Sequence, residues 1–277
     1  MTDQSSAPAD HLHVTPINPV APYVGGKRLL SKTLIERIEA TPHKMYAEPF
    51  VGMGGIFLRR RMAPRTEVIN DISKDVYGLF RVLQAHYSYF VDYLKFHLAS
   101  RAEFERLQDV APETLTDIQR AARFLYLQRM AFGGKVSNRN FGTHSDKSSR
   151  FNISRLIPML DDLHERLSGV VIECLPYGDF IARYDRPETL FYLDPPYWGS
   201  EDYYGEEVFT RDDFKQLAGI LSGIKGRFIL SLNDTPGVRE TFADFNIEAV
   251  ETRYSLSGKK SKPTGEVIIT NYSATTT

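Results

Sequence analysis

An acid, two prolines and an aromatic ring follow one another directly after an apolar run, in the segment DPPY that begins at Asp194. The Asp194 carboxylate is a hydrogen-bond acceptor, and Pro195 has no N–H, so its carbonyl can point outward as a second acceptor. Pro196 restricts Pro195 to extended geometry, and Tyr197 offers a flat face for stacking. This set suits a planar group that carries an NH₂, such as the exocyclic amine of a base. A turn that only ends a strand is the alternative.

A glycine-rich turn stands between a predicted strand and a predicted helix, in the segment AEPFVGMGG at 47–55. Gly52 and Gly54 let the backbone approach a ligand closely. Asp71 ends the next β-branched run, and an acid about 20 residues beyond such a turn is typical of ribose binding. Together these features predict a site for a nucleoside-bearing cofactor. The sixth-position glycine of a dinucleotide fingerprint is missing, which argues against a nicotinamide dehydrogenase.

Basic residues are segregated along the chain, although its net charge is only −1. Between Ile118 and Leu160 the only acid is Asp146, and no acid lies between Thr252 and Gly265. Segregated positive charge predicts that one face meets a polyanion; charges that merely solvate helix faces are the alternative. The basic residues of the two segments are Arg120, Arg123, Arg129, Lys135, Arg139, Lys147, Arg150 and Arg155, and then Arg253, Lys259, Lys260 and Lys262.

The hydrophobic pattern predicts strands that alternate with helices, which is typical of an α/β sheet with right-handed crossovers. A helical and basic block between 75 and 160 interrupts the alternation, as an inserted recognition subdomain would, and residues 133–152 predict an exposed loop or irregular hairpin. Thr116 or Asp117 is the expected N-cap of its clearest helix. The predicted helices are 28–40, one that opens near Gly54, 74–108, 114–132, 154–167 and 210–223, and the predicted strands are 66–72, 170–175, 190–194, 226–234, 248–256 and 266–272.

Composition and length restrict the class of protein. The 277 residues are 42% hydrophobic and 25% charged, as in an ordinary globular protein. No apolar run approaches the roughly 18–20 residues of a membrane span. The N-terminus lacks the features of a secretory signal, and we expect residues 1–20 to be a disordered lead-in. Cys174 is the only cysteine, which excludes disulfides and a cysteine-based metal site and favours the cytoplasm.

A series of segments resembles, in order along the chain, those of the Dam-type DNA adenine N6-methyltransferases: YVGGK, EPFVGMGG, NDIS, FLYLQRMAFGG, YGDF, LDPPYWG, SLND and the late basic loop. They extend over residues 22–272, and DPPY with the upstream GGK is the most specific combination. The resemblance implies a Rossmann-like methyltransferase sheet, S-adenosylmethionine as methyl donor and adenine in double-stranded DNA as acceptor, without a metal. It implies a catalytic domain at 21–74 and 161–273, and a DNA target-recognition subdomain at 75–160.

The resemblance also implies roles for single residues. Tyr23 stands where some members have Trp, and the loop at 133–152 differs from that of the best-known GATC readers, which leaves the target sequence open. The catalytic residues carried over are Asp194, Pro195, Pro196 and Tyr197, and the cofactor-binding residues are Tyr23 and Lys27 beside the cofactor or the target base, Phe50, Gly52 and Gly54 around its methionine part, Asp71 at its ribose, Asp179 near its adenine, and Asp194.

The charge pattern supplies the candidates for DNA contacts. Asn138, Arg139 and Asn140 are the candidates for base edges, whereas the other basic residues are expected to hold phosphates. The complete set is Arg129, Lys135, Asn138, Arg139, Asn140, Lys147, Arg150, Lys259 and Lys260.

The chemistry of adenine predicts the mechanism. The lone pair of its amine is delocalised into the ring, so the nitrogen is a poor nucleophile. If Asp194 and the Pro195 carbonyl accept its two hydrogens, a tetrahedral nitrogen aimed at a sulfonium methyl is favoured, and the carboxylate stabilises the positive charge that develops. The base must first be flipped out of the duplex.

Alternatives remain at this level. A first alternative is an enzyme that methylates an RNA adenine or a protein glutamine by the same chemistry. A second is an inactive DNA-binding protein on the same scaffold, and the intact DPPY segment and Asp71 argue against this second alternative. Monomer and weak dimer both stay open. So do roles in restriction-modification, in phage self-protection and in regulation.

Overall fold

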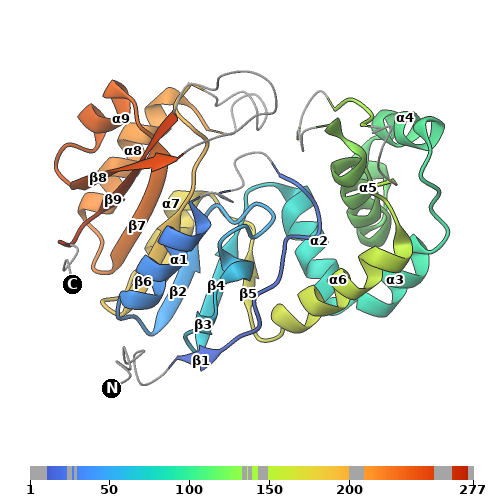
Figure 1. The fold of residues 1–277 in the computed structure, drawn as a ribbon, viewed down its shortest axis with the longest axis horizontal. Coiled ribbons are helices and arrows are strands. Elements are labelled where there is room, and N and C mark those ends of the chain that lie inside the picture. The colour runs from blue at the N-terminus through green and yellow to red at the C-terminus, as the bar shows by residue number, and fades with distance from the viewer. Residues whose placement is uncertain are drawn as a thin grey trace.

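A mostly parallel sheet forms the centre of the computed structural model (Figure 1). The structure describes residues 11–23, 27, 30–132, 136, 139–142, 149–199, 209–252 and 264–273. Its strands are β1 (Leu12–His13), β2 (Met45–Glu48), β3 (Met62–Ala63), β4 (Thr66–Asn70), β5 (Val171–Glu173), β6 (Thr189–Leu193), β7 (Arg227–Asn233), β8 (Asn246–Thr252) and β9 (Thr264–Thr270). In the large sheet the order is β5-β4-β2-β6-β7-β9-β8; β9 is antiparallel to both neighbours, and the other pairs are parallel. The short strands β1 and β3 pair separately.

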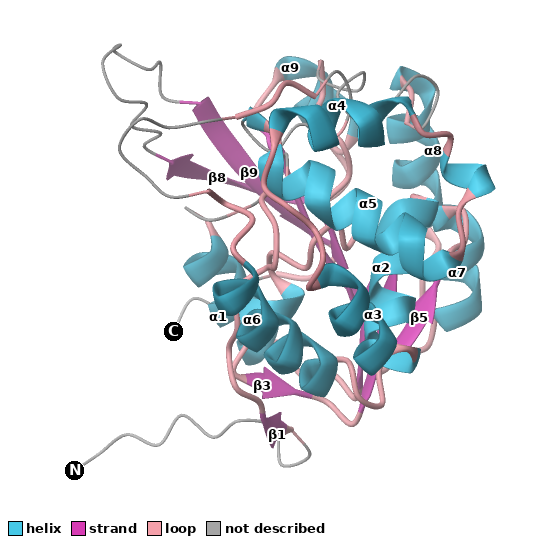
Figure 2. Ribbon diagram, turned by 90° about the vertical axis from the view of Figure 1, so that its right-hand side faces the viewer, coloured by secondary structure: helices cyan, strands magenta, loops and turns pink. Residues whose placement is uncertain are grey.

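Helices cover both faces of the sheet and form a layered group beyond β5. They are α1 (Ser31–Ala40), α2 (Lys74–Ala85), α3 (Tyr87–Leu94), α4 (Arg101–Asp109), α5 (Asp117–Met130), α6 (Ile153–Arg166), α7 (Tyr177–Tyr184), α8 (Arg211–Ser222) and α9 (Pro236–Thr241), with short 3₁₀ turns at Phe57–Arg59 and Pro112–Thr114. Figure 2 shows α4, α5 and α3 one below the other at the helical end of the molecule. None of the helices in the described ranges is long and apolar enough to cross a membrane.

The central strands are apolar because they are buried from both sides. All five positions of β6 are buried. Alternate residues of a strand point to opposite faces, and accordingly Tyr192 joins an apolar cluster with α1, whereas Phe191 and Leu193 join another with α7 and α8. The strand can therefore carry Asp194 at its end without interrupting either cluster.

Most of the predicted elements are confirmed within one to three residues. Thr116 is the N-cap of α5, where it forms a capping box with Gln119. The helix expected near Gly54 is only the 3₁₀ turn Phe57–Arg59, since Gly54 has φ +75 and the chain becomes extended again at Arg60. The pattern over 74–108 is three helices with a break at His86 and another before α4. The segment YGDF begins α7, which the sequence left unassigned.

One apolar cluster runs from the sheet into the helical group. It contains Tyr46 of β2 together with Phe80 of α2, Phe124 of α5 and Leu160 of α6. The α2 and α6 helices thus share a core with the sheet, although most of α2 and the first half of α6 belong to the predicted 75–160 subdomain. The division into a catalytic domain and a recognition subdomain stays a prediction.

Candidate active site

The chain changes direction in the sheet between β2 and β6. From β2 it continues to β4 and β5 on one side, and from β6 to β7 on the other. In open α/β sheets, ligands bind beyond the carboxyl ends of the strands at such a switch point. A cavity of about 960 Å³ lies there, and its lining includes Glu48 and Phe50 after β2 and Asp194 after β6. The two sequence segments with the strongest chemical signals therefore meet at one site.

A buried ammonium joins the catalytic candidates. Lys27 Nζ lies 3.1 Å from Asp194 Oδ1 and donates a hydrogen bond to the Tyr197 hydroxyl. The same Nζ lies 4.0 Å from the centroid of the Tyr197 ring, and the Lys27 side chain is 1% exposed. The structure thus brings together three residues that the sequence placed at the site. It adds Glu266 of β9, whose Oε2 is 3.3 Å from Lys27 Nζ.

Burial and neighbouring charges decide the ionisation of Asp194. Burial raises the pKa of Asp194 to about 6, the Lys27 ammonium acts against this rise, and the Glu266 carboxylate adds to it. At neutral pH the Asp194 carboxylate is therefore mostly ionised. It is an acceptor with negative charge beside an open cavity.

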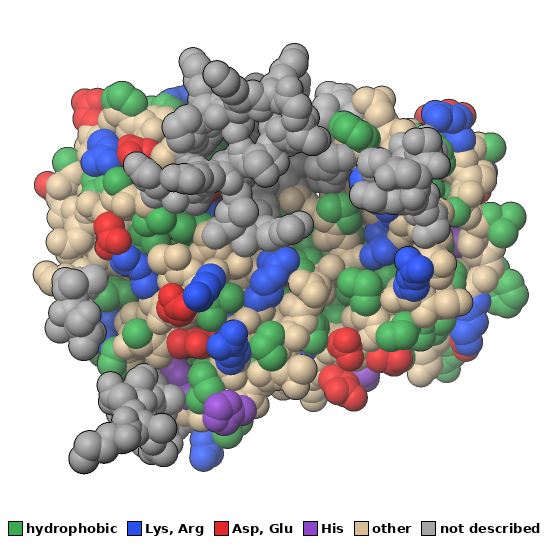
Figure 3. Space-filling model, in the orientation of Figure 1, with side chains coloured by type: hydrophobic (Ala, Val, Ile, Leu, Met, Phe, Trp, Pro, Cys, Tyr) green, Lys and Arg blue, Asp and Glu red, His purple; other side chains and the backbone are tan. Residues whose placement is uncertain are grey.

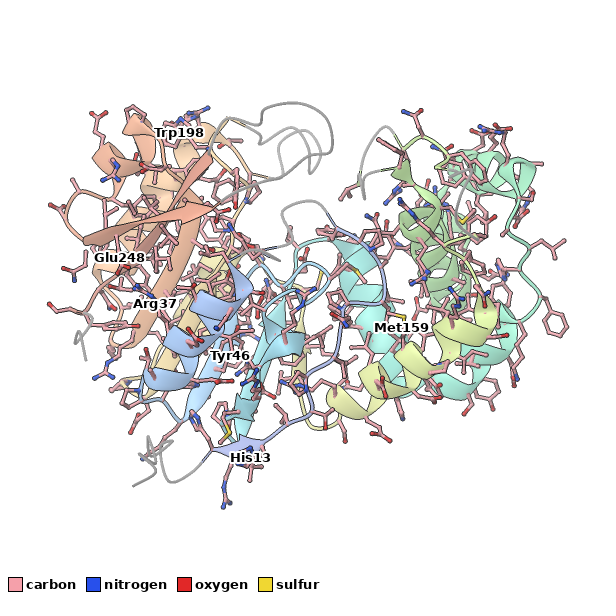
Figure 4. All side chains as sticks on the ribbon, in the orientation of Figure 1. His13, Arg37, Tyr46, Met159, Trp198 and Glu248 are labelled. Atoms are coloured by element: carbon pink, nitrogen blue, oxygen red, sulfur yellow. The ribbon has the colours of Figure 1, made fainter. Side chains whose placement is uncertain are left out.

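The end of the DPPY segment is held by one amide side chain. The Trp198 N–H donates to Asn233 Oδ1 over 3.0 Å, and Asn233 Nδ2 donates to the Trp198 carbonyl over 2.9 Å. Figure 4 shows Trp198 at the upper edge of the sheet region. Because both backbone groups of Trp198 are bound, the chain after Tyr197 is fixed to the end of β7. Pro195 and Pro196 are buried in the same segment, and Pro196 lines the cavity.

The glycine turn is shaped by its own backbone and by Asp71. Gly52 and Gly54 have φ values of +51 and +75, which favour glycine. A Cβ on Gly52 would meet the Tyr23 ring at 3.2 Å. The Gly52 N–H and the Ser73 N–H each donate to Asp71 over 2.9 Å. Burial nevertheless raises the pKa of Asp71 to about 6, and its carboxyl group lines the cavity.

An aromatic wall bounds another part of the cavity. The ring centroid of Phe50 lies 5.6 Å from that of Tyr177 and 5.9 Å from that of Phe209. The Tyr177 hydroxyl donates to Asp213 Oδ1 over 2.9 Å. Asp179, predicted near the cofactor's adenine, is exposed in the first turn of α7 and is not among the residues that line the described cavity.

Glu48 is a second buried acid of the cavity. It is 2% exposed and accepts a hydrogen bond of 2.6 Å from the Tyr46 hydroxyl. Burial raises the pKa of Glu48 to about 8, and the nearby Asp194 charge adds to the rise. At pH 7 this side chain is therefore mostly a neutral carboxylic acid.

Several predicted DNA contacts have partners inside the protein. Arg129 donates to the carbonyls of Val20 and Arg150, and both arginines line the cavity. Arg139 donates to Gln128 over 3.2 Å, and burial lowers its pKa. Asn140 is exposed, and its carbonyl accepts from the Phe132 N–H. Lys135, Asn138, Lys147, Lys259 and Lys260 lie outside the described residues.

Other members of the basic stretch also have structural partners. Arg120 forms an ion pair of 2.6 Å with Asp75, and Arg123 donates to the backbone carbonyls of Leu107 and Gln108. Figure 3 shows basic and acidic side chains mixed over the visible described part of one face. The DNA-contact residues stay predictions. In the part of the chain that the structure covers, no three His, Cys, Asp or Glu side chains are grouped to hold a metal.

Several residues of the site were missed by the sequence argument, among them Glu48 and Asp213 of the cavity lining. Glu266 is an acid in an otherwise apolar strand, which is a signal that could have been used, and Asn233 belongs to the quoted SLND segment. Tyr177 belongs to YGDF, of which only the acid was chosen. Phe209 has no local signal, because it is one of many phenylalanines outside any motif.

A Rossmann-like sheet with a reversed strand near one edge, and with DPPY at its switch point, is the arrangement of a methyltransferase. The family model described as D12 class N6 adenine-specific DNA methyltransferase matches residues 23–256. The chain belongs to this family. The predictions of the fold class, of the family and of an adenine-specific DNA methyltransferase are thereby confirmed.

Curated relatives match over nearly the full length. Type II methyltransferase M1.LlaDCHI of Lactococcus lactis subsp. cremoris is 27% identical over 92% of this chain and 96% of its own. Type II methyltransferase M.CviBI of Paramecium bursaria Chlorella virus NC1A is 22% identical over 92% of this chain and all of its own length. Retron Ec67 DNA adenine methylase of Escherichia coli is 25% identical, over 89% of this chain and 88% of its own.

Proposed function

We propose that the protein transfers a methyl group from S-adenosylmethionine to N6 of an adenine that is flipped out of duplex DNA. The observation that carries the proposal is the position of Asp194. Its ionised carboxylate ends β6 at the sheet's switch point, beside Lys27 and Tyr197 and at the wall of a cavity of about 960 Å³.

The residues of the cavity fit this cofactor. Its ribose has two hydroxyl donors, and Asp71 offers carboxylate oxygens that can accept beyond their two backbone N–H bonds. Its adenine is a flat aromatic group, and the wall of Phe50, Tyr177 and Phe209 offers faces and edges for such a ring. We assign ribose binding to Asp71 and adenine binding to this wall.

The methionine part is assigned to the glycine turn and the residues opposite it. Gly52 and Gly54 keep this turn free of side chains, and Tyr23 packs against Gly52. We place the amino and carboxylate groups between this turn and Arg129, which reaches the cavity from α5. When bound, S-adenosylmethionine supplies an electrophilic methyl group on a sulfonium.

The protein's own groups make the amine reactive. Asp194 and the Pro195 carbonyl accept its two hydrogens, which draws the nitrogen lone pair out of the ring. As the N–C bond forms and the methyl–sulfur bond breaks, positive charge develops on that nitrogen, and the Asp194 carboxylate stabilises it without having to reorient. The nitrogen then releases one of its two hydrogens as a proton to water, and S-adenosylhomocysteine is the other product. Tyr197 stacks on the base, and Lys27 holds the Tyr197 ring through its hydroxyl and a cation–π contact.

Flipping costs a few kcal/mol of lost stacking and pairing, which DNA contacts must offset. The candidates remain the residues predicted from the charge pattern. Of these, Arg150 reaches the cavity and can serve the flipped nucleotide or its phosphate, whereas Arg129 is assigned to the methionine part. Lys135, Lys147, Lys259 and Lys260 are proposed as phosphate contacts of the flanking duplex.

Product analysis tests the proposal. The purified protein is incubated with methyl-labelled S-adenosylmethionine and unmethylated duplex DNA, single-stranded DNA or RNA, and the nucleosides are separated after digestion. We expect label in N6-methyladenine, with the highest rate on duplex DNA. Label mainly in RNA, or in 5-methylcytosine, would overturn the proposal. Sequencing of the methylated adenines then gives the target sequence.

A further inference from the structure

A buried carboxylate behind Lys27 has no role in the mechanism above. Glu266 lies on β9, its side chain is 1% exposed, and its Oε2 is 3.3 Å from Lys27 Nζ. The strand residues that follow it, Val267–Ile269, are apolar and buried. A carboxylate in such surroundings costs desolvation, which pairing offsets only in part. Its position beside the catalytic ammonium therefore requires an explanation.

The charges around Lys27 explain the position of Glu266. The ammonium lies 3.1 Å from Asp194 and 3.3 Å from Glu266, so it is shared between two carboxylates. Of the described residues, Glu48 and Tyr192 also interact with Asp194, and burial raises the pKa of both, while Tyr197 binds the ammonium. The three residues Lys27, Asp194 and Glu266 together contribute one positive and two negative charges.

We propose that Glu266 is a positioning residue of the methyl transfer, which holds the Lys27 ammonium in place and offsets its charge, so that the charge of Asp194 remains available to the target amine. Without Glu266, Lys27 and Asp194 would form a neutral pair, and this pair would offer no net negative charge to the positive charge developing on the amine. The inference rests on the proposed role of Asp194.

The strand pairing supports a positioning role. Glu266 is the direct partner of Asn233 in the antiparallel β7–β9 ladder, and Asn233 binds both backbone groups of Trp198. Two paired residues of one ladder therefore hold the surroundings of the DPPY segment. Glu266 binds Lys27, and Asn233 binds Trp198 at the end of the segment. A shift of Glu266 would move the ammonium that contacts both Asp194 and Tyr197.

Glu266→Gln tests the inference through the pH dependence of kcat. We expect kcat at pH 7.5 to fall by about tenfold or more, with KM for both substrates nearly unchanged. The acid limb of kcat should move to lower pH, because the charge of Glu266 raises the pKa of Asp194. A loss of packing alone would lower the melting temperature without moving this limb. Glu266→Asp, which keeps the charge, should recover part of the rate.

Glu248→Gln is the matched control. Glu248 lies on the adjacent strand β8 and forms an ion pair with Arg37; both residues are labelled in Figure 4. It should retain the wild-type kcat and pH profile. A folded Glu266→Gln enzyme with the same kcat and acid limb as this control would overturn the inference.

A second comparison does not depend on the single variant being folded. In Lys27→Met the acid limb should move to higher pH, and in Lys27→Met/Glu266→Gln it should move back, because the second carboxylate is gone. An identical limb in the two variants would also overturn the inference. The proposed function fails separately, namely if the wild type makes no N6-methyladenine or if Asp194→Asn is fully active.

Discussion

Asn233 and Glu266 are direct partners across the antiparallel strands β7 and β9; the Asn233 side chain binds the end of the catalytic segment, and the Glu266 side chain binds the lysine that contacts it. Asn233 binds the backbone of Trp198, and Glu266 pairs with the Lys27 ammonium that contacts Asp194. The antiparallel strand β9, which lies between β7 and the edge strand β8, thus contributes to the site as well as to the sheet. It supplies a buried charge from a part of the chain that is 239 residues away from Lys27.

The acid limb of the rate should report Asp194. The reaction needs the ionised carboxylate, whose pKa burial raises to about 6. Activity is therefore present above this pH and is lost as the pH falls through it, with kcat decreasing by about tenfold per pH unit. The measurement is kcat between pH 5 and 8 at saturating substrates, with circular dichroism to verify folding. A flat profile down to pH 5 in a folded enzyme would contradict the assignment.

The aromatic wall should act on cofactor binding and not on the chemical step. Phe50→Ala removes a half-buried ring that contacts Tyr177 and Phe209. Since a stacked base is worth about 1–3 kcal/mol, we expect the Kd of S-adenosylmethionine to rise by about 5- to 150-fold, with little change in kcat. Phe245→Ala, at a ring that contacts Phe228 away from the cavity, is the control and should leave the Kd unchanged. Equal affinities of the two variants would remove the wall from the cofactor site.

Glu48 should make the fold less stable as the pH rises. Its pKa is about 8 in the folded protein, against an ordinary value of 4.5, so between these pH values the folded state holds a proton that the unfolded chain has lost. The free energy of unfolding therefore decreases with pH in this window, by up to about 1.4 kcal/mol per unit from this group.

Glu48→Gln removes that dependence and keeps an acceptor for the Tyr46 hydroxyl. Urea unfolding at pH 5.5, 6.5 and 7.5 should show the variant gaining stability relative to the wild type at each step. Parallel curves for the two proteins would show that Glu48 does not retain its proton in the folded state.

Arg139 should contribute to the fold more than to base reading. Its guanidinium donates to Gln128 and lies over Phe124, and Gln108 binds its carbonyl. We expect Arg139→Ala to lower the melting temperature and to leave the sequence preference and the salt dependence of DNA binding unchanged. Lys135→Ala, in contrast, should reduce the slope of log K against log salt by about 1 if it contacts phosphate. An altered target preference in a fully stable Arg139→Ala protein would restore it as a base contact.

Local sequence signals located the chemistry but not its surroundings. DPPY and the glycine turn each need a special backbone conformation, which their prolines and glycines indicate within a few residues. The apolar run before Asp194 indicates a buried strand that places this residue at the carboxyl edge of the sheet. A crossover brings Phe209 to the cavity, and the strand reversal at β9 brings Glu266 to Lys27. The residue pattern around Phe209 or Glu266 does not indicate which distant residues each of them will contact.

The basic residues between Ile118 and Leu160 show the same limit, because their partners could not be predicted from the local sequence either. Counting charges between Ile118 and Leu160 indicated a polyanion-binding surface, but Arg120 pairs with Asp75 and Arg123 binds two backbone carbonyls. The partners of Arg120 and Arg123 lie on other helices. The lack of acids in the sequence next to these arginines therefore does not indicate whether they are paired.

The most direct test of the account is the rate of a single turnover by Asp194→Asn. This change keeps the shape of the side chain and removes its charge, and Asp212→Asn, at an exposed aspartate of α8, is the control. We predict that Asp194→Asn binds DNA and S-adenosylmethionine nearly as the wild type does but forms N6-methyladenine about 100-fold more slowly or worse, whereas Asp212→Asn is unaffected. An Asp194→Asn enzyme that retains half of the wild-type rate would contradict the central role of this carboxylate.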